Sequence, residues 1–124
     1  MQKKKMRQRE TTFMSNKCGD IITVIGESAH KFAKTLEADT RVYSYKTSVP
    51  VEITLTDFQT IGIRPSYLKE EWLSDFQIEM VDGRVVIVEV TTKELLTKKA
   101  EIEKLELSRR FWLTKGFAWM MAMV

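Results

Sequence analysis

An Asp82-Gly83 pair lies between two stretches in which apolar and polar residues alternate, and this feature constrains the fold more than any other. Alternation with a period of two is typical of a strand that buries one face. Asp-Gly between two such stretches is a strong signal for a tight hairpin. The pattern therefore predicts two antiparallel strands, at residues 72–81 and 84–92.

The apolar faces of these two strands fix how they pair. Phe76 and its alternate neighbours are apolar on the first strand, as are Val88 and its alternate neighbours on the second. Matching these faces pairs Phe76 with Val88 and requires a three-residue loop with Gly83 in a left-handed conformation. The same register places Asp75 directly across from Glu89, with Cβ atoms about 5 Å apart.

Two opposed carboxylates repel each other unless something compensates them. A divalent cation is one explanation, because Mg²⁺ usually binds one or two carboxylates together with water and phosphate oxygens. Such a cation activates water and stabilises the negative charge that develops at a phosphodiester. Lys93 shares the side of Glu89 by the period of two, so it is placed to approach a phosphate if the strand extends that far.

A purely structural explanation of the same acids is also open. In that interpretation Asp75 marks a strand edge and Glu89 pairs with a lysine. It must then place an acid inside the apolar run at 85–90, which costs free energy unless the charge is compensated.

The remaining predicted elements surround the hairpin. Residues 27–38 form an amphipathic helix, residues 42–54 a strand region, residues 94–114 a long helix and residues 117–124 a buried last strand. Residues 56–71 form a long connection of the kind that is often functional. Helices and strands in this order indicate an α/β domain.

The charge of the chain is concentrated near its start. The 124 residues are one domain's worth, with a net charge of +3, and residues 1–17 hold six basic residues and one acid. We expect residues 1–17 to be a flexible basic arm and residues 18–124 to be the folded domain. The arm would bind nucleic acid by counterion release, or it is a solvated terminus without a partner. The arm residues predicted to bind DNA are Lys3, Lys4, Lys5, Arg7 and Arg9.

A second basic group opens the long helix. Lys98 and Lys99 begin a stripe of lysines and arginines that could face DNA. Glutamates at helical spacing within the same stripe favour the alternative of a solvated, ion-paired face.

Composition excludes several classes of protein. The single cysteine, Cys18, excludes an intramolecular disulfide framework and favours a reducing, cytoplasmic setting. The single histidine, His30, argues against a zinc site built on histidines. No apolar run reaches the roughly 18 residues of a membrane span, so no membrane partner is expected.

Several segments together resemble TnsA, the endonuclease subunit of heteromeric bacterial transposases and a member of the PD-(D/E)XK, or restriction-endonuclease-like, superfamily. The resemblance covers about residues 27–121. Its segments are Ser74-Asp75-Phe76, the Asp82-Gly83 turn, Ile87-Val88-Glu89-Val90, the run from Glu103 to Trp112 that reads Glu-Lys-Leu-Glu-Leu-Ser-Arg-Arg-Phe-Trp, and Ala118-Trp119.

This resemblance implies a fold and a chemistry. The fold is an αβββαβ core with a mixed central sheet flanked by helices. Asp75 matches the metal-binding aspartate, Glu89 the first position of the (E/Q)-x-K motif, and Val90 would lend its carbonyl oxygen. The cofactor would be Mg²⁺ or Mn²⁺. The activity would be cleavage of the 5′ strands at transposon ends in DNA, beside a TnsB-type transposase and a TnsC-type ATPase.

Two motif positions depart from the family pattern. Thr91 stands where the motif has lysine, and Ala29 stands where the family's first helix has glutamate. Lys93 and Glu27 are the nearest substitutes, although two residues along a helix is a rotation of about 200°. The alternatives are therefore a catalytically silent nuclease-fold module that binds DNA or protein, and a stand-alone phage or restriction-type nuclease. A homodimer is possible, since such nucleases often need two subunits to cut two strands.

Overall fold

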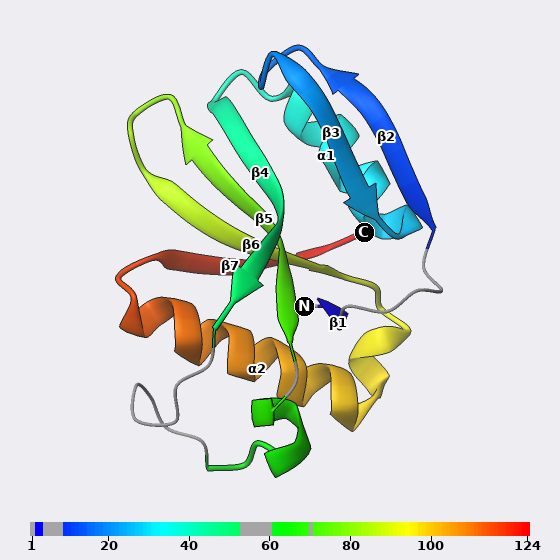
Figure 1. Cartoon of the computed structure of the whole chain (residues 1–124), viewed down its shortest axis with the longest axis vertical. Helices are drawn as coiled ribbons and strands as arrows, with labels where there is room; N and C mark the ends of the chain where they lie inside the picture. The colour runs from blue at the N-terminus through cyan, green and yellow to red at the C-terminus, as the bar shows by residue number, and fades with distance from the viewer. Residues whose placement is uncertain (1, 4–8, 53–60, 70) are drawn as a thin grey trace.

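The computed structural model describes residues 2–3, 9–52, 61–69 and 71–124. Figure 1 shows the arrangement of its elements. In chain order they are β1 (Gln2–Lys3), β2 (Glu10–Ser15), β3 (Asp20–Ile25), α1 (Glu27–Ala38), β4 (Val42–Val51), the 3-10 turn η1 (Pro65–Lys69), β5 (Trp72–Met80), β6 (Val85–Thr91), the 3-10 turn η2 (Leu95–Thr97), α2 (Lys99–Thr114) and β7 (Ala118–Met123).

A mixed sheet forms the centre of the molecule. Its strands β4, β5 and β6 are antiparallel neighbours, and β7 runs parallel to β6 after the crossover through α2. The short β1 also pairs with β5. The predicted α/β class and the sequence of helix, strands, hairpin, helix and strand are confirmed (Figure 1).

The central hairpin has the predicted register. Phe76 pairs with Val88. The N–H of Met80 donates to the carbonyl of Arg84 at 2.8 Å, which closes a three-residue loop. Gly83 has a φ of 90°, a left-handed conformation that costs glycine little.

Two hydrophobic clusters cover opposite faces of β6. Val88 and Val90 pack with buried residues of α1, whereas Ile87 packs with Leu107 and Phe111 of α2. Alternate residues of a strand point to opposite faces, so the two helices lie on the two sides of the sheet. Odd-numbered residues of β6, which include Glu89, therefore face α2.

Strands β4 and β5 change sides near Ser48. Tyr45 packs in the α1 cluster, yet Val51, at the same parity, packs in the α2 cluster. On β5, Phe76 packs in the α1 cluster and Trp72, also at the same parity, packs in the α2 cluster. Ser48 lies between the two halves of β4 with a φ of 49°, which is uncommon for a residue other than glycine. This local twist lets each strand contribute to both clusters.

The structure differs from the expected flexible arm over residues 1–17. Glu10–Ser15 form β2, which pairs with β3 in a second hairpin, and Phe13 packs against the α1 cluster. The strand-forming run Thr11-Thr12-Phe13-Met14 explains this pairing, because β-branched and aromatic residues fit a half-buried pleated surface. The predicted arm residues Lys4, Lys5 and Arg7 lie outside the described residues.

The last strand was predicted to be buried, but most of its residues are exposed. β7 has β6 as its one partner in the described part of the sheet, and the side chains of Met120 and Met123 are 48% and 55% exposed. Apolar composition alone does not distinguish a central strand from an edge strand. The predicted long helix also begins later, at Lys99, because the preceding residues form the turn η2.

Among the described residues, no helix has the length and apolar character needed to cross a membrane.

Candidate functional site

Asp75 and Glu89 meet where β5 and β6 diverge. The backbone pairing of the two strands ends at Phe76 and Val88. Beyond that point the N–H of Asp75 donates to Oε1 of Glu89 at 2.9 Å, and the N–H of Val90 donates to Oδ2 of Asp75 at 2.8 Å. The two carboxylates thus link the diverging strands by accepting backbone hydrogen bonds across the gap. Asp75 is 6% exposed and Glu89 is fully buried.

The second oxygen of Glu89 faces α2 and accepts two hydroxyl donors. Ser74 Oγ donates to Oε2 at 2.7 Å, and Ser108 Oγ donates to the same oxygen. Each hydroxyl accepts in turn from an indole, since Trp112 Nε1 lies 2.8 Å from Ser74 Oγ and Trp119 Nε1 lies 3.0 Å from Ser108 Oγ. Glu89 therefore lies at the centre of a network drawn from β5, β6, α2 and β7.

Sequence reasoning missed the four members of this network beyond Glu89. Ser108 and Trp112 are four residues apart, which places them on one side of a helix. That spacing was the available signal. Their contact with Glu89 depends on how α2 crosses the sheet, which a local pattern does not reveal.

Thr91 occupies the position where the resemblance expects lysine. It is fully buried, and its Oγ1 donates to Oε2 of Glu101 at 2.7 Å. β6 ends at this residue, and Lys93 lies in the following turn with an exposed side chain. The strand therefore does not extend far enough to align Lys93 with Glu89, and the structure does not bring Lys93 into the buried pair.

Glu27 also lies apart from the acid pair. Its side chain is 81% exposed, and its carboxylate lies 3.7 Å from Nζ of Lys31 on the same helix. Ala29 is 4% exposed and packs in the α1 cluster. The helix thus buries the alanine and presents the glutamate to solvent.

The expected DNA-binding residues fall into two regions. Lys98 and Lys99 are exposed at the start of α2, and Arg9 is exposed before β2. Lys3 lies in β1, whose backbone pairs with Trp72. β4 occupies the other edge of β5 at Trp72, so β1 lies on the same edge of β5 as β6 (Figure 1).

The oxygen atoms of the pair suit a hard divalent cation. Asp75 and Glu89 both present carboxylate oxygens, which are the hard ligands that such a cation prefers. Mg²⁺ commonly binds one or two carboxylates and completes its shell with water and phosphate oxygens. No group of three His, Cys, Asp or Glu side chains able to hold a metal occurs in the described ranges. The two acids fit this two-carboxylate mode of binding.

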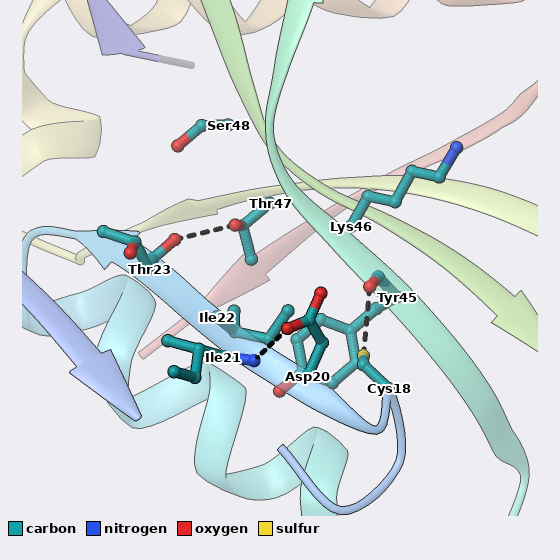
Figure 2. A pocket seen from close by; sticks show the side chains of 9 residues that line it. All are labelled: Cys18, Asp20, Ile21, Ile22, Thr23, Tyr45, Lys46, Thr47 and Ser48. Atoms are coloured by element: carbon teal, nitrogen blue, oxygen red, sulfur yellow. Dashed lines mark hydrogen bonds between the residues drawn. The ribbon is translucent and has the colours of Figure 1, made fainter. Parts of the chain in front are cut away.

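Two hollows lie away from the acid pair. One, of about 560 Å³, separates β3 from β4 around Cys18, and Figure 2 shows Thr47 Oγ1 donating across it to the carbonyl of Thr23 at 2.7 Å. The other, of about 580 Å³, lies between α1 and β7 and is mostly apolar in its lining residues. Neither contains a cluster of acids and bases comparable with the Asp75–Glu89 pair.

The fold and this site define an α/β protein with a buried carboxylate pair at the centre of a mixed sheet. Comparison of the chain with models of known protein families and with curated proteins finds no match.

Proposed function

We propose that this chain is a nuclease-fold domain of the PD-(D/E)XK type, similar to TnsA, which hydrolyses phosphodiester bonds in DNA with a divalent cation. The observation that carries the proposal is the meeting of Asp75 and Glu89 on the two middle strands, where β5 and β6 diverge. Two buried acids that each accept a backbone hydrogen bond from the neighbouring strand support a function that uses both of them.

The residues of the site would have different roles. Asp75 and Glu89 would hold Mg²⁺ or Mn²⁺, with the carbonyl of Val90 as a further oxygen ligand. When bound, the cation would lower the pKa of water and stabilise the negative charge of the phosphodiester. The basic residues near the N-terminus would attract the DNA backbone, and β1, which contains Lys3, pairs with β5 at Trp72 and Leu73, close in the strand to Asp75.

A second candidate has its own support. Lys93 and Glu27 are exposed, and the hydroxyl of Thr91 is engaged with Glu101. These observations favour a catalytically silent module that keeps the nuclease fold and binds DNA or protein. The exposed Lys98 and Lys99 at the start of α2 would then belong to the binding surface.

The setting of the reaction is part of the proposal. A TnsA-like domain would cut the 5′ strands at transposon ends in the cytoplasm, with a TnsB-type transposase and a TnsC-type ATPase, and two copies would cut two strands. A stand-alone phage or restriction-type nuclease with the same core would need neither partner.

Isothermal titration with Mg²⁺ and Mn²⁺ tests the acid pair directly. We expect saturable binding by the wild type, loss of binding in Asp75→Ala, and unchanged binding in Asp82→Ala. Asp82 is a matched control because it is an exposed aspartate in the turn of the same hairpin. Absence of binding at millimolar metal would count against the endonuclease.

Cleavage of plasmid DNA then separates the two candidates. The endonuclease predicts metal-dependent nicking by the wild type, with or without partner proteins, and none by Asp75→Ala. The silent module predicts DNA retention in a gel-shift experiment that Asp75→Ala does not alter, without nicking in any combination.

A further inference from the structure

We propose that Ser74 and Ser108 are positioning residues for Glu89, held in their donating direction by Trp112 and Trp119. This inference rests on the proposed function, since it concerns how the same site presents its glutamate to a cation. All five side chains are joined by hydrogen bonds, and Glu89 and both serines are fully buried.

The direction of each hydrogen bond in the network is determined by chemistry. An indole nitrogen donates and never accepts, so the two serine oxygens must accept from Trp112 and Trp119. Each hydroxyl has a single hydrogen, which then points to Oε2 of Glu89. The two tryptophans therefore fix the hydroxyl hydrogens that hold the glutamate.

This arrangement gives the two oxygens of Glu89 different tasks. Oε2 accepts two hydroxyl hydrogens, which occupies both of its lone pairs. Oε1 accepts the N–H of Asp75 and lies toward that residue. The network thus leaves Oε1 on the side of Asp75, where it holds the backbone of the neighbouring strand and where a cation bound by Glu89 would lie.

A purely structural role would predict a different set of effects. The fold contains a matched case, because Ser15 is also fully buried and donates to a glutamate, Glu37, at 2.5 Å. Loss of Ser15 should disturb packing and hydrogen bonding to a similar extent. It should leave Glu89 and its ligands unaffected.

The indole N–H resonances of the three tryptophans provide the first test in a two-dimensional ¹⁵N spectrum. We expect Ser74→Ala to shift the Trp112 peak and Ser108→Ala to shift the Trp119 peak. Glu89→Gln should shift both, because the amide alters what each hydroxyl faces. The Trp72 indole, which donates to the carbonyl of Tyr67, is the internal reference, and Ser15→Ala should leave the Trp112 and Trp119 peaks in place. Unmoved Trp112 and Trp119 peaks in Glu89→Gln would overturn the network.

Metal affinity provides the second test, by Mn²⁺ titration of the same variants. Loss of a group that orients a metal ligand commonly costs 10- to 100-fold in affinity, so we expect about a tenfold weakening in Ser74→Ala and in Ser108→Ala. Ser108→Thr, which keeps the hydroxyl, should retain most of the affinity, and Ser15→Ala should retain all of it.

The outcomes separate this inference from the proposed function. Wild-type affinity in folded Ser74→Ala and Ser108→Ala would overturn the positioning role while leaving the metal site intact. A wild-type protein that binds neither ion would overturn the proposed function, and the indole peaks would still decide whether the serines hold Glu89.

Discussion

Two glutamates of this protein accept hydrogen bonds from buried serines, yet their surroundings differ. Glu37, on α1, accepts from Ser15 Oγ and from Tyr45 Oη at 2.5 Å each. Burial acts to raise the pKa of Glu37, but these hydroxyl donors, together with the backbone N–H groups of Asn16 and Lys17, hold the pKa below its ordinary value. The bonds tie the β2–β3 hairpin to α1 and β4, and their role is to join elements.

Glu89 has the same kind of donors together with a second carboxylate. Ser74 and Ser108 donate to it as Ser15 and Tyr45 donate to Glu37. Each glutamate also accepts a backbone N–H, Glu89 from Asp75 and Glu37 from Lys17. Hydrogen-bond satisfaction alone therefore does not mark a functional acid. The opposed second acid is what distinguishes the candidate site, and the following experiments test that distinction.

The largest expected effect is on metal affinity. Glu89→Gln should weaken Mn²⁺ binding by about 100-fold, because a neutral amide replaces one of two anionic ligands. Glu37→Gln should leave the affinity within about twofold. Isothermal titration measures both. Equal weakening in the two variants would show that the second acid does not separate these regions.

The second-largest expected effect is on the free energy of unfolding. Here the surroundings of Glu37 and of Glu89 should behave alike. Ser15→Ala and Ser74→Ala should each lower the free energy of unfolding by about 2 kcal/mol, since each leaves buried polar partners without a hydrogen bond. Urea denaturation measures this loss, with exposed Ser66→Ala as the control. A stability within about 0.5 kcal/mol of the wild type in either variant would contradict the expectation.

The pH dependence of stability isolates the joining role of Glu37. Its folded-state pKa lies below its ordinary value, so its contribution is present above that ordinary value and is lost as pH falls through the folded pKa. Glu106, whose pKa is lowered to about 2 chiefly by hydrogen bonding from Arg109, acts in the same direction.

We therefore expect the urea midpoint to fall progressively between about pH 5 and pH 2. Glu37→Gln should remove part of this slope, because a neutral amide does not titrate. A midpoint that stays constant from pH 5 to pH 3 would be the contrary result.

The smallest expected effect concerns Glu27, the acid that the motif comparison proposed as a catalytic residue. Its carboxylate is exposed beside Lys31, and exposed helix pairs contribute little. Glu27→Ala should leave both the urea midpoint and the Mn²⁺ affinity unchanged. A weakened affinity would show that Glu27 reaches the acid pair after all.

The sequence allowed much of the fold to be predicted. The apolar stripe placed α1 at residues 27–38, and alternation around Asp82-Gly83 gave the register that brings Asp75 to Glu89. These features depend on local periodicity, which residue types encode directly.

Features that depend on long-range packing were missed. No local sequence pattern distinguishes the exposed edge strand β7 from a central strand. Strand β2 was missed because the basic residues before it led to the prediction of a flexible arm. The serines and tryptophans around Glu89 become partners because α2 crosses β6 at Ser108. The alignment of Lys93 with Glu89 was predicted on the condition that the strand extended that far, but β6 ends at Thr91.

The change of sides at Ser48 has a consequence for how the protein unfolds. β4 and β5 each place residues in both hydrophobic clusters, so neither cluster can lose its strands without exposing the other. The two halves of the molecule are thereby coupled into a single cooperative unit, which should melt in one transition. A ligand that binds the acid pair would then raise the free energy of unfolding of the whole unit, including the β2–β3 hairpin.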